Sequence, residues 1–165
     1  MLSLRVKIRN NNYSNTKTMK TTDEPIIVEQ IVHASVQNIW NALTDLKVMK
    51  QWFFNNIESF KPEVGFETQF MVQVEGRKFT HLWKLTEVIH NKKITYNWKY
   101  LEYSGDSFVT FEIIEENNNI KVKVSTKVVE NFPSNIPEFE RESGVNGWNY
   151  FIKKNLKEYL ETNRS

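Results

Sequence analysis

The chain has 165 residues, of which 39% are hydrophobic and 25% are charged, and it is rich in aromatic side chains, with 11 Phe, 6 Tyr and 5 Trp. Its net charge of +2 leaves no concentrated basic face, which argues against nucleic acid or an anionic membrane as a partner. The absence of cysteine excludes disulfides, thiol catalysis and thiolate metal sites, and it fits the reducing cytoplasm, where we expect the protein.

Residues 1–24 predict a disordered tail, and residues 25–165 predict one domain. The tail is polar, rich in Asn, Thr and Lys, and without helical or strand periodicity after Ile8. It lacks the apolar stretch of a signal peptide, and no run approaches the roughly 18 apolar residues of a membrane span, so we expect no membrane insertion. Met19 is an alternative start to Met1, because ordered patterning begins only at Pro25.

The domain begins with a strand and two short helices. Residues 26–32 predict the strand, and Ser35 is a good N-cap for the first helix. Asp45 can cap a second helix, in which Met49 and either Trp52 or Phe53 turn inward. The apolar face of the first helix consists of Val36, Ile39, Trp40 and Leu43.

A series of alternating segments follows and predicts about six antiparallel strands. Glu75-Gly76-Arg77 is a plausible hairpin turn between the first two of them. Alternation of apolar with polar residues means that one face of the sheet is covered and the other is wet. The inward residues are Phe66, Thr68, Phe70, Val72 and Val74; Phe79, His81, Trp83 and Leu85; Ile94, Tyr96, Trp98 and Tyr100; Val109, Phe111 and Ile113; and Ile120, Val122, Val124 and Val128.

The final helix is predicted from about residue 138 to residue 161, with Pro137 at its first turn. Its apolar stripe consists of Phe139, Val145, Trp148, Ile152, Leu156 and Tyr159 or Leu160. The order of strand, two helices, strands and long helix predicts an α+β fold with the helices on one face of the sheet.

Gly144 and Gly147 lie in this final helix, although each glycine costs a helix interior roughly 0.5–1 kcal/mol relative to alanine. The two glycines are three residues apart and therefore share a face that has no side chains. Two readings stay open. The helix either packs closely on its neighbours, or it leaves a hollow that Trp148 roofs and aromatic rings such as Trp83 and Trp98 floor.

Several segments together resemble the START-like (SRPBCC, birch-pollen-allergen-like) superfamily. They are "IVHASVQNIWNALTDLKVMKQWF", "GFETQF", "HLWKLTEVIHNKKITYNWKY", "SFVTFEI" and "ESGVNGWNYFIKKNLKEYL". Within the superfamily they are similar to the branch named after the C-terminal domain of activators of the heat-shock protein 90 ATPase. The resemblance covers residues 26–161 and implies a helix-grip fold, a curved antiparallel sheet wrapped round a long C-terminal helix with a cavity between them.

A ligand cavity is therefore the candidate site. We expect no cofactor and no metal site, because His33, His81 and His90 show no ligand spacing. His81 is either a core histidine bonded to one neighbour or a polar contact inside the cavity. Glu142 either complements the helix dipole or lies at the cavity mouth. The expected lining is Trp52, Phe53, Phe70, Val72, Phe79, His81, Trp83, Trp98, Phe111, Glu142, Gly144, Gly147, Trp148 and Phe151.

These features favour a non-enzymatic domain that holds a small hydrophobic or amphipathic ligand. One alternative, implied by the resemblance, is a chaperone-associated protein that stimulates a heat-shock protein 90 class ATPase; the co-chaperones add a separate N-terminal domain that this sequence does not show. A second alternative is a cyclase or hydrolase that uses His81 with a carboxylate such as Glu142 as an acid–base pair. The lysines at 153, 154 and 157 are expected on a solvated helix face.

Overall fold

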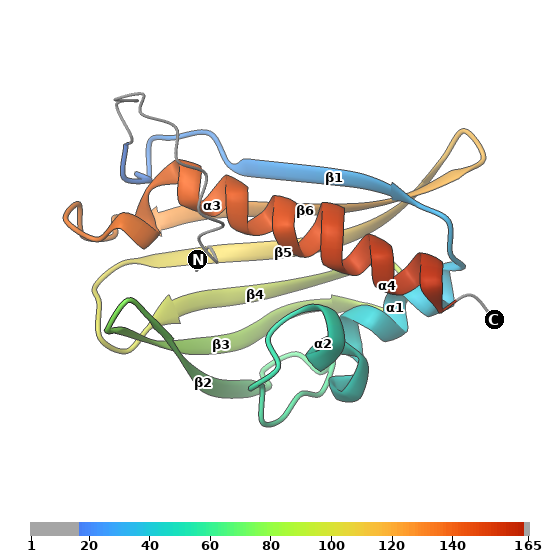
Figure 1. Ribbon diagram of the computed structural model, residues 1–165, viewed down its shortest axis with the longest axis horizontal. Helices are drawn as coiled ribbons and strands as arrows, with labels where there is room; N and C mark the ends of the chain where they lie inside the picture. Colours follow the sequence, from blue (N-terminus) through green and yellow to red (C-terminus); the bar gives the residue numbers. More distant parts are fainter. Residues whose placement is uncertain (1–16, 164–165) are drawn as a thin grey trace.

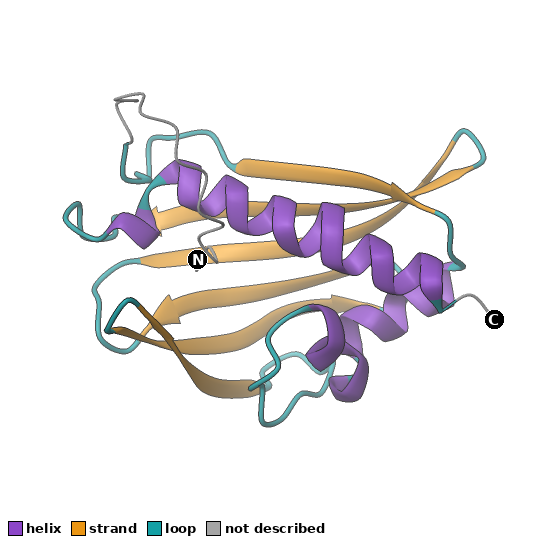
Figure 2. Cartoon of the chain, viewed as in Figure 1, coloured by secondary structure: helices purple, strands orange, loops and turns teal. Residues whose placement is uncertain are grey.

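A six-stranded antiparallel sheet, in the order β1-β6-β5-β4-β3-β2, curves behind a long C-terminal helix (Figure 1). The structure is a computed structural model, and it describes residues 17–163. The strands are β1 (Ile26–Val32), β2 (Glu67–Val74), β3 (Arg77–Ile89), β4 (Lys93–Tyr100), β5 (Asp106–Glu116) and β6 (Asn119–Glu130). The helices α1 (Val36–Thr44) and α2 (Leu46–Trp52) lie on the same face of the sheet as the C-terminal helix (Figure 2). The predicted α+β helix-grip fold is confirmed, with five strands rather than about six after the two short helices.

Both predicted helix caps are present. The hydroxyl of Ser35 accepts a hydrogen bond from the backbone N–H of Asn38 at 3.1 Å. The Asp45 carboxylate accepts from the backbone N–H groups of Lys47 at 2.9 Å and Val48 at 3.2 Å. These bonds fix where α1 and α2 begin, and they set the position of the aromatic residues that follow α2.

The inward faces of the strands follow the predicted alternation. On β3 the four predicted inward residues are all buried, and the same holds for β4. The outer face is polar and carries cross-strand ion pairs such as Lys84–Glu67 at 2.9 Å. The hairpin between β2 and β3 has a two-residue turn in which Glu75 and Gly76 both have positive φ, 46° and 82°, as a type I′ turn requires.

The C-terminal helix runs from Arg141 to Thr162 and is not uniform. It consists of α3 (Arg141–Trp148), a π-helical stretch η2 (Asn149–Leu156) and α4 (Lys157–Thr162). The predicted start at residue 138 is wrong, because Glu140 is extended (φ −68°, ψ 144°) and separates α3 from the short 3₁₀ helix η1 (Pro137–Phe139). Among the helices of residues 17–163, none is long and apolar enough to cross a membrane.

Residues 17–24, which the sequence assigns to the tail, lie against the start of α3. The backbone N–H of Met19 donates to the Phe139 carbonyl at 3.2 Å, and that of Arg141 donates to the Lys17 carbonyl at 2.9 Å. The Met19 side chain is buried in the core. The remainder of the predicted tail, residues 1–16, lies outside the described residues.

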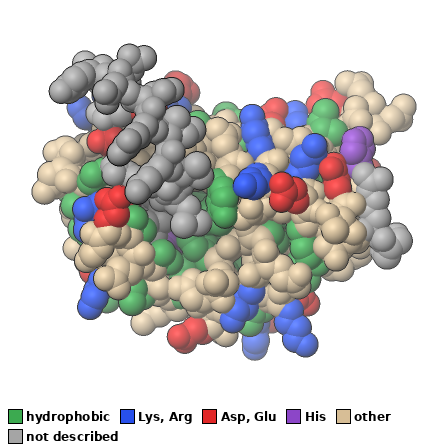
Figure 3. Space-filling view, in the orientation of Figure 1, with side chains coloured by type: hydrophobic (Ala, Val, Ile, Leu, Met, Phe, Trp, Pro, Cys, Tyr) green, Lys and Arg blue, Asp and Glu red, His purple; other side chains and the backbone are tan. Residues whose placement is uncertain are grey.

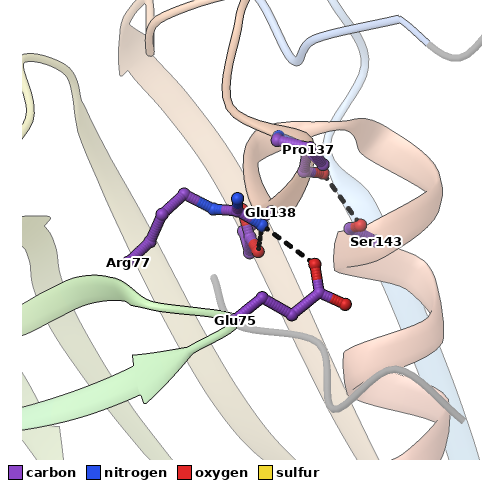
Figure 4. A network of polar contacts seen from close by, with 5 residues as sticks. All are labelled: Glu75, Arg77, Pro137, Glu138 and Ser143. Atoms are coloured by element: carbon purple, nitrogen blue, oxygen red, sulfur yellow. Dashed lines mark hydrogen bonds and ion pairs between the residues drawn. The ribbon is translucent and has the colours of Figure 1, made fainter.

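An ion pair joins the β2–β3 turn to the short helix η1, which precedes the C-terminal helix (Figure 4). The Arg77 guanidinium donates to both carboxylate oxygens of Glu138, at 3.0 Å and 2.6 Å, and it also contacts Glu75 at 3.3 Å. Glu138 is buried, so the bidentate bond supplies the partner that a buried carboxylate needs. The hairpin is thereby tied to the segment that leads into the C-terminal helix.

Candidate functional site

Aromatic rings fill the layer between the sheet and the C-terminal helix. Phe53 lies at the centre of this layer, where its ring centroid is 4.8 Å from that of Phe151, 5.7 Å from that of Trp83 and 6.1 Å from that of Trp148. Trp148 also contacts Phe111 at 5.6 Å. The rings come from the loop after α2, from β3 and β5, and from the long helix, and together they form one continuous cluster.

The predicted lining residues are buried, with two exceptions. Val72 is half-buried, and Glu142 is exposed on α3. The other twelve are Trp52, Phe53, Phe70, Phe79, His81, Trp83, Trp98, Phe111, Gly144, Gly147, Trp148 and Phe151. The rings of Phe53, Trp98 and Phe111 occupy the volume next to the ring of Trp148. Aromatic side chains therefore fill the space beside Trp148 in which a cavity was one of the two predicted arrangements.

Open volume lies further along the helix, in a groove of about 500 Å³ between the end of α2, the edge strand β2 and η2. Its wall is held by two side-chain amides. Asn155 of η2 donates to the Trp52 carbonyl at 3.1 Å, and Asn56 donates to the Met71 carbonyl. The lining residues are Lys50, Gln51, Phe53, Phe54, Asn55, Asn56, Met71, Val72, Gln73, Val74, Tyr150, Phe151 and Asn155. The lining combines apolar rings and aliphatic side chains with polar side chains in similar proportion, and its volume lies within the range of small-molecule sites.

His81 lies beneath this groove, on the inward face of β3, and is fully buried. Its ring stacks on Phe70 with 4.6 Å between centroids, and its Nδ1 lies 3.0 Å from the carbonyl oxygen of Phe79. A carbonyl oxygen only accepts, so Nδ1 carries the proton and Nε2 is left as an acceptor. Nε2 has no hydrogen-bond partner among the described residues. Burial holds the pKa of His81 well below its ordinary value of 6.5, so the ring is neutral at pH 7.

Trp83, two residues further along β3, has a buried hydrogen-bond donor without a partner among the described residues. Its ring is buried, and its Nε1–H has no hydrogen-bond partner within residues 17–163. Three other tryptophans in the core do have one: Trp52 donates to the Ala42 carbonyl at 2.7 Å, Trp98 to the Tyr100 hydroxyl at 3.0 Å and Trp148 to the Thr126 hydroxyl at 2.9 Å. The unpaired N–H of Trp83 is therefore unusual within this core.

The acid–base pair considered for an enzyme is not formed. Glu142 is exposed, whereas the neighbours of His81 are the rings of Phe54, Phe70, Trp83, Trp98 and Tyr100. Within the described part of the chain, no carboxylate bonds to His81, and no cluster of His, Asp or Glu side chains is suited to hold a metal ion. On the helix-bearing face, acidic and basic side chains are interspersed (Figure 3).

The sequence reading missed Phe54. This residue lines the groove, and its ring also lies 4.9 Å from that of His81 and 6.1 Å from that of Trp83. It follows Trp52 and Phe53 at the end of α2, where helical periodicity stops and no longer indicates a direction. The run of three aromatic residues is the only signal that the sequence offers for it.

A family model described as "Activator of Hsp90 ATPase homolog 1-like protein" matches residues 33–161. A search of curated proteins finds no match. Three solved structures illustrate the shared fold. A protein from Chromobacterium violaceum is 18% identical, with a TM-score of 0.64, over 83% of this chain and 96% of that chain. The Aha1 dimer from Colwellia psychrerythraea is 21% identical, with a TM-score of 0.63, over 84% and 97%.

The third structure, a protein from Rhizobium leguminosarum, is 15% identical, with a TM-score of 0.69, over 85% of this chain and 95% of that chain. At such identities the likeness shows the fold alone. The family model, in contrast, spans most of the domain, from the end of β1 to the last turn of α4. This chain belongs to the family of activator of Hsp90 ATPase homolog 1-like proteins, which have the SRPBCC-type helix-grip fold.

Proposed function

We propose that this domain is a non-enzymatic binding protein that holds a small hydrophobic or amphipathic molecule between the sheet and the C-terminal helix. The observation that carries the proposal is the groove of about 500 Å³ beside η2, which opens directly above the aromatic cluster. Phe53 and Phe151 belong both to the groove lining and to the predicted ligand-lining set, and so does Val72.

The chemistry of the groove fits an amphipathic ligand. An apolar body that covers the edges of Phe53, Phe54 and Phe151 gains roughly 25 cal/mol for each Å² of apolar surface removed from water. The amides of Asn55 and Asn56 at the rim offer donors and acceptors to a polar end of the ligand. The groove therefore offers both the apolar area and the orienting contacts that a small-molecule site requires.

Binding of N-phenyl-1-naphthylamine, an uncharged probe that fluoresces in apolar surroundings, tests the proposal. We expect saturable binding that Val72→Glu weakens by about tenfold or more, because a carboxylate in the groove loses hydration when the probe binds. Gln69→Glu is the matched control, since it adds the same charge to β2 at an exposed position outside the groove, and it is expected to leave binding unchanged. Equal binding by both variants, or no binding to the wild type, refutes the proposal.

Contact with a chaperone is the second candidate, because the matched family model carries the name of an Hsp90 ATPase activator. Under this proposal, excess protein raises the ATP turnover of a purified Hsp90-class chaperone. The measurement separates the two functions, since Val72→Glu blocks the groove without changing the outer face of the sheet. No change in ATP turnover at excess protein removes this candidate.

A further inference from the structure

The geometry points to a polar subsite beneath the groove, formed by Nε2 of His81 and Nε1–H of Trp83, that binds a hydroxyl group of the ligand. This inference rests on the proposed function and names the class of ligand, an aromatic or alicyclic molecule with a hydroxyl at its buried end. It starts from the two buried nitrogens that find no partner within residues 17–163.

The two nitrogens have opposite hydrogen-bonding roles. Nδ1 of His81 donates to the Phe79 carbonyl, so Nε2 only accepts, whereas the indole nitrogen of Trp83 only donates. A hydroxyl group both donates and accepts and therefore satisfies both nitrogens. A ketone or an ether satisfies Trp83 alone, and a hydrocarbon satisfies neither.

The two rings lie close together. They project from the same face of β3 two residues apart, and their centroids are 6.4 Å apart with the planes at 88°. Two hydrogen bonds of about 2.8–3.0 Å that share one oxygen join nitrogens up to about 6 Å apart, and rings at this separation are compatible with such a bridge. Phe70 contacts both rings, at 4.6 Å from His81 and 4.7 Å from Trp83, and supplies an apolar wall beside them.

Phe54 connects this subsite to the groove. Its ring lines the groove on one side and contacts both His81 and Trp83 on the other. It lies in the connection between α2 and β2, outside regular secondary structure. A ligand whose apolar body rests on Phe53 and Phe151 therefore reaches the two nitrogens when the Phe54 ring turns aside.

Buried polar groups without partners also explain why such a subsite distinguishes ligands that carry a hydroxyl group from ligands that do not. A ligand that satisfies a buried donor and acceptor gains their hydrogen bonds, whereas an isosteric ligand without the hydroxyl leaves them unpaired. The probes are 2-naphthol, which has the hydroxyl, and 2-methylnaphthalene, which has the same ring system and nearly the same shape but carries a methyl group that neither donates nor accepts. We expect the wild type to bind 2-naphthol about tenfold or more tightly than 2-methylnaphthalene in calorimetric titrations.

Two variants assign that preference to the subsite. Trp83→Phe removes the unpaired N–H and is expected to reduce the preference for 2-naphthol to less than about threefold. Trp98→Phe is the matched control, because it removes an equally buried indole whose N–H already has a protein partner, and it is expected to keep the preference. The indole ¹H–¹⁵N spectrum gives a direct reading that tolerates any loss of stability: on addition of 2-naphthol the Trp83 signal moves downfield, while the Trp98 signal does not.

The possible failures are distinguishable. If both probes bind in the groove with equal affinity, or if the Trp83 signal stays in place while methyl signals of Val72 and Val74 respond, the hydroxyl subsite is refuted and the binding function stands. If neither these probes nor N-phenyl-1-naphthylamine binds, the proposed function is refuted, and the subsite with it.

Discussion

A comparison of variants at Trp83 and Trp98 tests, without any ligand, whether the unpaired N–H of Trp83 destabilises the folded protein. Both rings are buried, at 2% and 1% exposure, and their centroids are 4.8 Å apart in the same cluster. Replacing either one by Phe removes a similar ring volume, so the cavity costs largely cancel in a comparison. The difference that remains is the hydrogen bonding of the two N–H groups.

Trp98→Phe loses a bond to the Tyr100 hydroxyl, which costs about 0.5–1.5 kcal/mol. Trp83→Phe instead removes a buried donor without a protein partner, whose desolvation costs the native state about 1–3 kcal/mol. The free energy of unfolding of Trp83→Phe is therefore expected to exceed that of Trp98→Phe by about 1.5–4.5 kcal/mol.

Urea unfolding followed by far-ultraviolet circular dichroism measures this difference. With a denaturant slope of about 2 kcal/mol per M, the two unfolding midpoints differ by about 1–2 M. Equal slopes for the two variants show that the comparison concerns stability and not compactness. If Trp83→Phe unfolds at the same urea concentration as Trp98→Phe, or at a lower one, the buried N–H of Trp83 does not destabilise the folded state. The reasoning behind the subsite then fails.

Acidification is expected to destabilise the protein through His81, because burial lowers its folded pKa while the unfolded chain takes up a proton below about pH 6.5. His81→Phe should reduce the loss of stability between about pH 6.5 and pH 5 by up to about 1.4 kcal/mol per pH unit. His33→Gln, at an exposed position, should not change that loss. Parallel curves of stability against pH for the wild type and His81→Phe would contradict this prediction. Gly105→Ala is expected to lower the melting temperature strongly, since Gly105 has φ +110° and an added Cβ would lie 2.9 Å from the Phe132 Cα. Gly65→Ala, at φ +88° with nothing within 4 Å of its Cβ, isolates the backbone cost alone, so an equal loss in both variants would rule out the clash.

Local patterns were sufficient to predict most of the fold. The caps at Ser35 and Asp45 and the turn at Glu75-Gly76 depend on residues within a few positions of each other, and they form as predicted. Strand alternation placed His81 and Trp83 on the covered face, because the side-chain period of a strand is two. These features are set by local chemistry and are readable from one sequence.

The π-helical stretch left only a weak trace. The buried residues Trp148, Ile152, Leu156 and Leu160 are spaced by four, and on a 3.6-residue helix each such step drifts by about 40°. Wider i→i+5 turns counteract that drift and keep the stripe facing the sheet. The same residues also fit an ordinary helical period, since a spacing of four satisfies that period over one or two turns.

The site itself depends on long-range contacts that no local pattern contains. Glu138 meets Arg77 across 61 positions, and Asn155 meets the Trp52 carbonyl across 103. Strand phase indicates which face a side chain occupies but not whether its polar atom finds a partner, so the unpaired nitrogens of His81 and Trp83 appear only in three dimensions. The expectation that Glu142 lies at a cavity mouth stays a prediction, because helix position alone does not fix the facing element.

A crystal structure of the protein with 2-naphthol tests the account most directly. The account predicts the naphthyl rings against Phe53 and Phe151, the Phe54 ring turned aside, and the hydroxyl oxygen within about 3.2 Å of both Nε1 of Trp83 and Nε2 of His81. A probe bound on another surface, or bound in the groove with its hydroxyl toward solvent and Phe54 still against His81, would contradict it.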